Sequence, residues 1–498
     1  MFAFETDIKD YVAVIDIGSN SVRLVVFSGE KRVPDTIFNE KVMVGLGAEV
    51  GSTGRMGKNA VLHALSTLKR FKALCEQMSI RTIHTVATAA VRDADNGLEF
   101  VAKVEEECGL KIAIIDGREE ARLAALGVLS GDPDAYGITG DLGGGSLELA
   151  QVKGGEVGET ISLPIGPLRL ISMFGYKRNK IRKYLRETFA SIEWLNERKK
   201  QNLYIVGGAW RNIARMMMME KAEPLPILHG YYSKRKECKA YCRRISKLNP
   251  RDIPFGTSIP TRRREILPIA AIILSELIDA MNSKHVVSTS YGLREGLIFD
   301  NLNANRRQDD PFLYVCNAIA MERSRFAEHS DVIYEWTRPL FNGKSSKKLS
   351  RERLHKAICL LSDIAWRGHP DFRAEKAVES VLHGNFVGVD HKERTYIAVA
   401  LNQAYGAAVD EPHISRMLPL LTIAEIQEAR LMGSALRLAQ RLSGGAVKAL
   451  EVSSLKVSKS KVKLDVPGSY RDIANDIVER RLRQLAQFIG RKPEIEYV

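Results

Sequence analysis

The sequence predicts a mixed α/β fold in which two copies of one domain face each other across a cleft, followed by an all-helical domain and a small α+β domain. Strand-like and helix-like patterns alternate through residues 11–300, and the pattern Asp-x-Gly-x-x-Ser occurs twice, at 16–21 and 141–146. Residues 312–445 are almost wholly helical in pattern. The expected domains are 1–124, 125–305, 306–445 and 446–498.

The first predicted domain begins with two strands joined by a short turn. Apolar and β-branched residues dominate YVAVIDIG (11–18), and SVRLVVFSG (21–29) has the same character. Residues 57–78 carry apolar side chains at helical spacing, and IHTVATAA (83–90) is strand-like. The segment EEARLAALGVL (119–129) then predicts a helix that leads into the second copy.

The second copy repeats the strand–turn–strand pattern in GITGDLGGGSLELA (137–150). A helix is expected at 177–200, and a strand followed by a turn at LYIVGGAW (203–210). In the tail, residues 449–466 alternate like strands. Residues 469–490 predict a helix whose N-cap is Ser469 or a neighbour.

The net charge of +14 predicts an anionic partner. Basic clusters occur at 176–183, 234–244, 262–264 and 344–356. Each cluster alone is typical of a solvated helix face, but their number favours a distributed anion-binding surface. No apolar run reaches the length of a membrane span, no export signal is recognised, and the scattered cysteines predict reduced thiols rather than a zinc site. We therefore expect a cytoplasmic protein without a membrane partner.

The two glycine-containing turns predict anion binding. A strand that ends in Asp and enters such a turn exposes neighbouring backbone N–H groups, which together bind anions. Glycine permits positive φ angles and the close approach of a phosphate oxygen. The expected phosphate-binding residues are Gly18, Ser19, Asn20, Ser21, Gly143, Gly144, Gly145 and Ser146.

The acids beside the turns predict a cation. A carboxylate next to a phosphate repels it unless a cation or a proton lies between them, so Asp16 and Asp141 predict Mg²⁺. Glu148 follows the second turn and is expected to contact the metal or to orient water. A single turn of this kind is often a hairpin without a ligand, whereas two turns in matching register are more specific. The two common nucleotide-phosphate motifs, G-x-x-x-x-G-K-[ST] and G-x-G-x-x-G, are absent from the sequence.

Five stretches across residues 11–300 resemble, in the same order, the exopolyphosphatase / guanosine pentaphosphate phosphohydrolase family of the actin, sugar kinase and heat-shock chaperone superfamily. They are VAVIDIGSNSVRLVVF, HTVATAAVRDADN, GITGDLGGGSLELA, LYIVGGAWRNIARM and VVSTSYGLREGLI. The resemblance implies two ribonuclease H-like (actin-like) lobes followed by an HD-like helical domain. Ser362-Asp363 stands where an active HD domain has His-Asp, which implies a lost metal ligand and a structural, polyanion-guiding role.

The same resemblance implies roles for individual residues. The family's catalytic glutamate falls in GREEAR, on Glu119 or Glu120, and the alignment favours Glu120. Asp141 and Glu148 are expected to act with it, and Asp16, Asp141 and Glu148 to hold Mg²⁺. Arg92 matches a phosphate-binding arginine, and Gly207 and Gly208 are expected to border the substrate path. Arg294 could approach the cleft or form a structural ion pair.

The function implied is Mg²⁺-dependent, processive release of terminal phosphate from inorganic polyphosphate by a homodimer with no specific nucleic-acid partner. The alternatives are a 5′-phosphohydrolase of guanosine pentaphosphate, a sugar or acetate kinase, and a non-catalytic polyphosphate-binding protein. The same machinery serves either phosphohydrolase. A kinase would need a purine pocket and an acceptor site, and the sequence shows a signal for neither.

Overall fold

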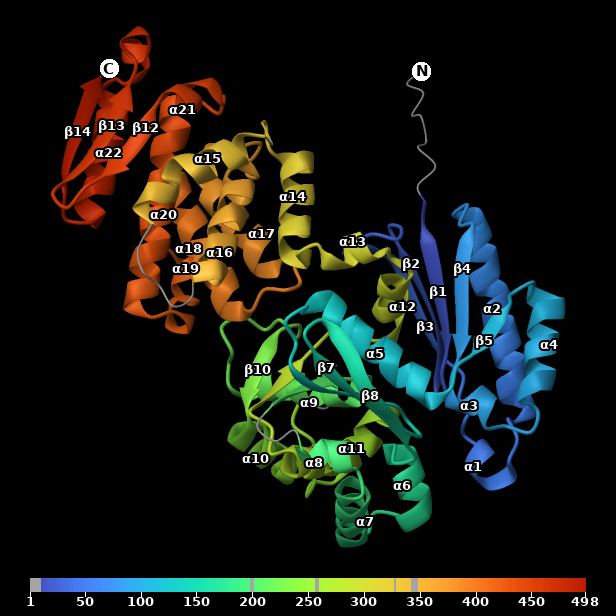
Figure 1. Cartoon of the computed structure of the whole chain (residues 1–498). Coiled ribbons are helices and arrows are strands. Elements are labelled where there is room, and N and C mark those ends of the chain that lie inside the picture. Colours follow the sequence, from blue (N-terminus) through green and yellow to red (C-terminus); the bar gives the residue numbers. More distant parts are fainter. Residues whose placement is uncertain (1–9, 198–200, 256–258, 327, 342–347) are drawn as a thin grey trace. The chain divides into compact units, whose positions relative to one another are not determined.

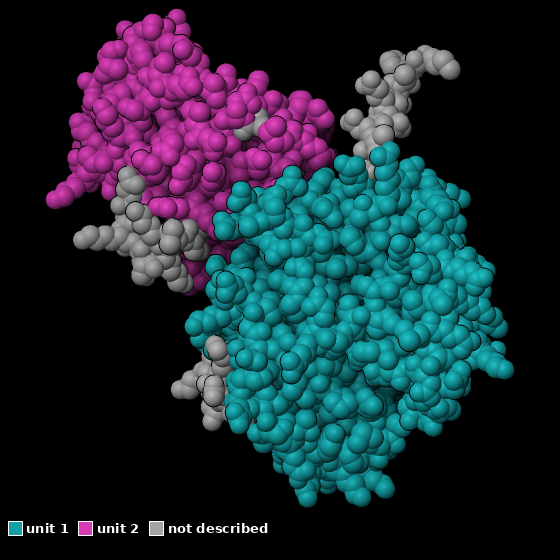
Figure 2. Space-filling model, turned by 45° about the vertical axis from the view of Figure 1, so that its right-hand side comes forward, with its two compact units in different colours: residues 1–309 teal, residues 310–498 magenta. Residues whose placement is uncertain are grey.

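The computed structural model describes residues 10–197, 201–255, 259–326, 328–341 and 348–498. The chain divides into two compact units, residues 1–309 and 310–498, which are coloured separately in Figure 2. The first unit contains two β-sheets, and the second is helical with a small sheet near its end. The predicted fold class is confirmed. The finer boundaries expected at 124 and 445 stay predictions.

The first sheet has five strands in the order β3-β2-β1-β4-β5. They are β1 (Val12–Ile17), β2 (Ser21–Phe27), β3 (Thr36–Met43), β4 (Thr82–Ala87) and β5 (Ile112–Ile114). Strands β1, β2 and β3 are antiparallel neighbours, whereas β4 runs parallel to β1 and β5 parallel to β4. The helices that accompany this first sheet are α1 (Val50–Thr53), α2 (Lys58–Gln77), α3 (Ala89–Arg92) and α4 (Gly97–Cys108). Strand β1 is buried almost throughout, as expected for an apolar central strand.

The second sheet has six strands in the order β10-β11-β9-β6-β7-β8. They are β6 (Gly137–Leu142), β7 (Leu147–Lys153), β8 (Glu156–Leu163), β9 (Asn202–Val206), β10 (Tyr231–Lys234) and β11 (His285–Ser288). As in the first sheet, three antiparallel strands come first and a parallel strand then pairs with the first of them. The internal repeat seen in the sequence is therefore a repeat of sheet topology.

Helices also cover the second sheet. They are α6 (Pro167–Phe174), α7 (Arg178–Ala190), α8 (Glu193–Glu197), α9 (Gly208–Glu220), α10 (Arg235–Ile245) and α11 (Thr261–Met281). The apolar side of α11 and Trp210 of α9 belong to one large core with β6, β7 and β9. The indole N–H of Trp210 donates to the carbonyl of Ala270 at 3.0 Å, which satisfies the one polar atom of this buried ring.

Helices α5 (Gly117–Gly131) and α12 (Leu293–Asn301) pack against each other between the two sheets (Figure 1). On α12, Ile298 is buried with side chains of β1 and β2, whereas its neighbour Phe299 joins a core that includes β7, β9 and β11. This helix pair therefore connects the cores of the two lobes. The short helix α13 (Ala304–Gln308) follows α12 and ends the unit.

The contact between α5 and α12 is made by backbone atoms. A Cβ atom on Gly127 would lie closer than 3.0 Å to the carbonyl of Gly292, and one on Gly296 closer than 3.0 Å to the carbonyl oxygen of Leu123. Backbone atoms cannot move aside as a flexible side chain can. The separation of the two helices is therefore set by two glycines.

The second unit is built mainly from helices. They are α14 (Pro311–Arg323), α15 (His329–Thr337), α16 (Lys348–Leu360), α17 (Arg373–His383), α18 (His391–Tyr405), α19 (Pro412–Ser415), α20 (Ile423–Ser443) and α21 (Lys448–Val452). Helices α18 and α20 pack closely against each other. The fully buried Arg394 of α18 donates to carbonyl oxygens that include those of Gly384 and Phe386, so its charge is solvated by the backbone.

The last part of the unit is a three-stranded sheet with one helix. Strands β12 (Ser454–Val457), β13 (Lys461–Val466) and β14 (Lys492–Tyr497) form the sheet, and helix α22 (Asp476–Phe488) packs on it. The sequence prediction that this helix is capped at Ser469 or a neighbour is wrong. The helix begins at Asp476, because the side chain of Asn475 accepts the first free N–H groups, and a 3₁₀ turn (Gly468–Ile473) precedes it.

None of the described helices combines the length and apolarity needed to cross a membrane. All six cysteines are buried and none forms a disulfide. Cys238 and Cys242 lie one turn apart on α10, and the hydrogen bond between the two thiols together with desolvation raises the pKa of Cys242. These thiols pack as small apolar side chains.

Candidate active site

The two glycine-containing turns have the same backbone geometry. The N–H of Gly18 donates to the carbonyl of Ser21 at 3.0 Å, and the N–H of Gly143 donates to the carbonyl of Ser146 at 3.0 Å. In the first turn, the backbone N–H groups of Ser19 and Asn20 have no hydrogen-bond partner among the described residues. In the second turn, the same is true of the N–H groups of Gly144 and Gly145. Neighbouring free N–H groups form a concave site for an anion.

Positive φ angles do not explain the glycines of these turns. Neither Gly18 nor Gly143, Gly144 or Gly145 has a positive φ, so the first of the two expected reasons for glycine is wrong. A Cβ atom on Gly145 would meet no atom within 4 Å. The fold does not require glycine at this position, and close approach of a ligand is the reason that remains.

The residues opposite the two acids differ between the turns. Asp16 pairs across its hairpin with Arg23, whereas Asp141 pairs with Glu148. One turn therefore combines an acid with a cation, and the other combines two acids. Arg294 of α12 donates to the carboxylate of Asp16 at 2.8 Å, so Arg294 both reaches the site and forms an ion pair.

Helix α5 brings one of two adjacent glutamates to this site. Its N-cap Asp116 accepts the N–H of Glu119 at 2.8 Å, and the carboxylate of Glu119 is held by Arg122 through two hydrogen bonds of 2.8 Å. Glu120 has a different environment. Its Oε2 is buried without a hydrogen-bond partner among the described residues and lies 4.0 Å from Nη1 of Arg92. Arg92 itself donates to the carbonyl of Ile115.

Desolvation and mutual repulsion favour the protonated forms of the acids. Desolvation raises the pKa of Glu120 well above its usual range, and the charges of Glu148, Asp141 and Asp16 add to this effect. Desolvation likewise raises the pKa of Asp141 to about 6 and that of Glu148 to about 7. The Oγ–H of Ser162 donates to Glu148 at 2.8 Å and favours its charged form. Acids this close cannot all ionise without a compensating cation.

The acids fit a divalent cation that takes part of its coordination from water and phosphate. In the described part of the chain, no group of three His, Cys, Asp or Glu side chains is arranged to hold a metal alone. Mg²⁺ usually takes only one or two carboxylates and completes its shell with waters and substrate oxygens. Asp141 and Glu148 can supply such a partial set, next to the unpartnered oxygen of Glu120. The metal roles of Asp16, Asp141 and Glu148 stay predictions.

Cationic side chains gather beside the acids. Arg23 on β2 and Lys41 on β3 are directly opposite each other. Lys41 is solvent-exposed, but partial desolvation and the charges of Arg263, Arg23 and Arg294 lower its pKa to about 8. Desolvation and the charge of Arg294 lower the pKa of Arg23 to about 10. The sequence analysis named Arg263 only as part of the basic cluster at 262–264 and missed Lys41, because no local pattern separates these side chains from other surface cations.

The turn before α9 is covered by one of these cations. Gly207 has a φ of 93°, and a Cβ on it would lie 3.1 Å from Oδ1 of Asp141. The guanidinium of Arg263 lies 3.2 Å from the position of a Cβ on Gly208. Arg211 on α9 donates to the carbonyl of Thr289 at 2.8 Å. The predicted residues of both lobes thus lie in one region, and a positive charge covers this turn.

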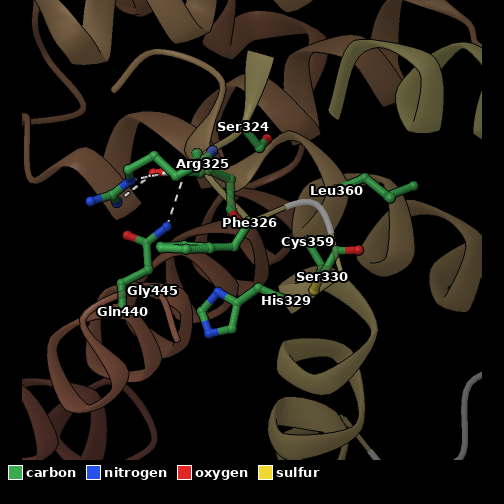
Figure 3. A pocket seen from close by; sticks show the side chains of 11 residues that line it. Ser324, Arg325, Phe326, His329, Ser330, Cys359, Leu360, Gln440 and Gly445 are labelled. Atoms are coloured by element: carbon green, nitrogen blue, oxygen red, sulfur yellow. Dashed lines mark hydrogen bonds and ion pairs between the residues drawn. The ribbon is translucent and has the colours of Figure 1, made fainter. Parts of the chain in front are cut away.

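Ser362 and Asp363 are among the residues that line a small pocket of the second unit. Figure 3 shows this pocket from close by. Asp363 accepts hydrogen bonds from Arg325 at Nε (2.9 Å), at Nη2 (2.7 Å) and at the backbone N–H (3.1 Å). His329, which also lines the pocket, lies 3.1 Å from the hydroxyl of Ser443. A guanidinium therefore neutralises the carboxylate of Asp363, and the guiding role expected of this domain stays a prediction.

Two family models cover nearly the whole chain. Residues 24–305 match the model described as the Ppx/GppA phosphatase family, and residues 312–496 match the model described as exopolyphosphatase, C-terminal. The first match contains both lobes except the first strand and the first turn. The second match corresponds closely to the second compact unit.

Two relatives differ in how much of this chain they share. Retrograde regulation protein 2 of Saccharomyces cerevisiae is 24% identical over an alignment of 456 residues, which covers 82% of this chain and 75% of that protein. The bifunctional 3-dehydroquinate synthase/phosphatase of Fusobacterium nucleatum is 27% identical over an alignment of 311 residues, which covers 58% of this chain. The chain spans 46% of that bifunctional protein.

Solved structures share the fold of the first unit. The Ppx/GppA family member of Aquifex aeolicus has a TM-score of 0.51 and 27% identity, covering 59% of this chain and 99% of that one. An exopolyphosphatase from Cytophaga hutchinsonii has a TM-score of 0.54 and 23% identity over similar shares of the two chains, 59% and 99%, which shows a common fold. From the family match over residues 24–305 and the agreement of fold, the chain belongs to the Ppx/GppA phosphatase family.

Proposed function

We propose that the chain is an exopolyphosphatase that hydrolyses the terminal phosphate of inorganic polyphosphate, processively and with Mg²⁺. The observation that carries this proposal is the group of Arg23, Lys41 and Arg263 beside the two turns. Desolvation lowers the pKa of all three, and the charges of Arg263 and Arg23 also lower that of Lys41. A polyanion relieves that repulsion. Membership of a phosphatase family supports the chemistry. Homodimer formation and a cytoplasmic location stay predictions.

The chain's own groups can hold the terminal phosphate without a covalent step. The free N–H groups of the two turns can bind an anion, and Arg92, whose Nη1 lies 4.0 Å from Oε2 of Glu120, is a further donor. Phosphoryl transfer depends chiefly on positioning and on neutralising the phosphate oxygens. Mg²⁺, when bound beside Asp141 and Glu148, supplies part of that neutralisation.

Glu120 is positioned to act as the general base. In its charged form, which a compensating cation favours, the unpartnered Oε2 of Glu120 accepts a proton from water while the water oxygen forms a bond to the terminal phosphorus. The bond from this phosphorus to the bridging oxygen breaks, and its electron pair stays on the shortened chain, which leaves as the product. Glu148, fixed by Ser162, orients the attacking water.

The same machinery would hydrolyse guanosine pentaphosphate, and Arg263 favours the inorganic substrate. Its guanidinium lies 3.2 Å from the position of a Cβ on Gly208, at the turn that, by resemblance, matches the one that receives the nucleoside in nucleotide-binding relatives. A cation there extends a phosphate path and occupies space that a base would need. We expect a higher kcat/KM for long polyphosphate than for guanosine pentaphosphate when orthophosphate release is measured on both. A preference for the nucleotide would overturn the assignment.

Gly145→Ala is expected to reduce activity without reducing stability. The added methyl group meets open space, so the free energy of unfolding should stay within about 0.5 kcal/mol of the parent value. The methyl group also crowds the turn N–H groups, and a lost donor at such a site costs about 10²-fold in rate. Thermal unfolding and orthophosphate release measure the two effects. Gly51→Ala on α1, where a Cβ also meets nothing, should alter neither; unchanged activity in Gly145→Ala would contradict ligand approach at this turn.

Lys41 should give substrate binding a pH dependence. The pKa of Lys41 is lowered to about 8, so its charge is present below that pH and is lost as the pH rises through it. We expect KM for long polyphosphate to rise about tenfold across this step, because a charge-assisted contact is worth about 1.5 kcal/mol or more. The groups that face Lys41 are Arg263, Arg23, Arg294 and Asp16.

Lys41→Arg is the diagnostic variant for this step, because a guanidinium stays protonated throughout the range. Steady-state KM measured from neutral to alkaline pH should then show no step. Lys69→Arg changes an exposed lysine that is paired with Glu107, and this variant should keep the step. Persistence of the step in Lys41→Arg would show that another group causes it.

A further inference from the structure

Carboxylates within the fold neutralise much of three of the basic clusters seen in the sequence. Arg182 and Arg186 on α7 both contact Glu276, which is 3% exposed. Further pairs join Lys239 to Asp279, Arg244 to Glu220, Arg353 to Asp310 and Arg351 to Glu428. The expectation of a distributed anion-binding surface is therefore weaker for these clusters, and residues 344–347 lie outside the described residues.

A different group of arginines has no such compensation. Arg437 and Arg441 lie one turn apart on α20, and Arg480 and Arg481 lie on α22, which packs against α20 in the second unit (Figure 1). Within the described residues, none of the four forms an ion pair with a carboxylate. Arg483 on the same helix shows the contrast, because it is paired with Glu479 at 2.8 Å.

The four charges act on one another. Desolvation and the charges of Arg481, Arg441 and Arg480 together lower the pKa of Arg437 to about 10, with no acid acting in the opposite direction. Desolvation and the charges of Arg480 and Arg441 likewise lower the pKa of Arg481. The Nε atom of Arg481 is buried and has no hydrogen-bond partner among the described residues. The group thus contains both unbalanced charge and an unused donor.

Arg437 is held in position at this site. A Cβ on Gly406, the residue that ends α18, would lie closer than 3.0 Å to the guanidinium of Arg437. The side chain therefore lies flat against a backbone that has no side chain of its own. A fixed guanidinium loses less conformational entropy when it binds a ligand than a freely moving one does.

We propose that Arg437, Arg441, Arg480 and Arg481 form a second anion site, which binds the oligophosphate group of a ligand. Guanidinium groups bind phosphate oxygens through two parallel hydrogen bonds, and four of them match a ligand with several negative charges. The shared chemistry is a chain of phosphates, whether inorganic or part of a nucleoside triphosphate. The site lies wholly in the second unit and uses none of the residues proposed for hydrolysis.

Binding of tripolyphosphate to the full chain tests the site. The measurement is isothermal titration calorimetry at low ionic strength with a chelator present, so that no hydrolysis occurs. The double variant Arg437→Gln/Arg481→Gln should bind one tripolyphosphate fewer per chain, or bind it at least about tenfold more weakly. Orthophosphate release from a short substrate with Mg²⁺ should be unchanged. The measurement compares the number of tripolyphosphate molecules bound by the parent and by the double variant, so the test is valid even if the first unit binds no polyphosphate.

The matched control removes two positive charges that are already paired. Arg483 and Arg338 are exposed and contact Glu479 and Glu335, so Arg483→Gln/Arg338→Gln changes the net charge equally and should bind like the parent. If both double variants lose tripolyphosphate binding equally, the binding reflects the net positive charge of the chain and the proposal is wrong. If the first double variant unfolds, Arg480→Gln/Arg441→Gln, at the two exposed positions, replaces it. Competition with ATP distinguishes the two kinds of ligand. If ATP displaces tripolyphosphate, the site accepts the triphosphate group of a nucleotide; if it does not, the site binds the inorganic chain.

Discussion

Glu120→Gln is expected to lower the rate of orthophosphate release by about a thousandfold and to leave polyphosphate binding nearly intact. The amide keeps the size of the side chain but cannot accept a proton, and a positioned general base contributes about 10²–10⁴-fold to the rate. Because desolvation and neighbouring acids already disfavour the charge on Glu120, removing that charge should not destabilise the fold. Release at saturating polyphosphate and equilibrium dialysis measure the two properties.

The adjacent glutamate provides the control. Glu119→Gln removes the same charge one residue earlier, but Glu119 is held by Arg122 outside the acid group. This variant should keep the parent rate within about threefold and lose at most about 1 kcal/mol of stability. The reverse result, with activity lost in Glu119→Gln and kept in Glu120→Gln, would assign the base to the other residue. A parent chain that binds polyphosphate but releases no phosphate would favour the non-catalytic alternative.

Gly296→Ala should be the most destabilising small substitution in the first unit. The new methyl carbon would lie closer than 3.0 Å to the carbonyl oxygen of Leu123, so α5 and α12 must separate. Overpacking of this kind costs about 3 kcal/mol. We also expect lower activity in the folded fraction, because α5 carries Glu120 and α12 carries Arg294.

Denaturant unfolding of the full chain measures the loss of stability. Gly145→Ala adds the same methyl group at a position where it meets nothing, so it controls for the chemical change. A Gly296→Ala variant as stable as Gly145→Ala would show that α5 and α12 separate at little cost. In that case the backbone contact would not set the spacing of the helices.

The parts of the site that could be predicted are local or repeated in the sequence. Each turn and its acid lie within a single hairpin. Because the same pattern occurs at residues 16–21 and 141–146, each turn supported the interpretation of the other as an anion-binding turn. The sequence favoured Glu120 over Glu119 by alignment alone. The structure adds that α5 is capped at Asp116, that Glu119 is held by Arg122, and that Glu120 lies among the other acids. The sequence alone did not show these contacts.

The parts that could not be predicted depend on partners far apart in the chain. Lys41 and Arg263 meet because β3 and α11 converge in the fold, and no local pattern records such a meeting. For the same reason the cluster at 176–183 looked free: its Arg182 pairs with Glu276, which lies 94 residues away. Strand β14 was missed because it pairs with β13 across an intervening helix.

The backbone contact between α5 and α12 also limits how the two lobes can move. Two close approaches of main chain to main chain hold the distance between the helices, and the ion pair of Arg122 on α5 with Asp300 on α12 joins them as well. The helices therefore have little freedom to slide, and we expect any relative motion of the lobes to be a small rotation about this crossing. Glu120 and Arg294 lie near the beginnings of the two helices and turn with them. Residues beside this crossing are therefore expected to shift less than residues far from it when the lobes move.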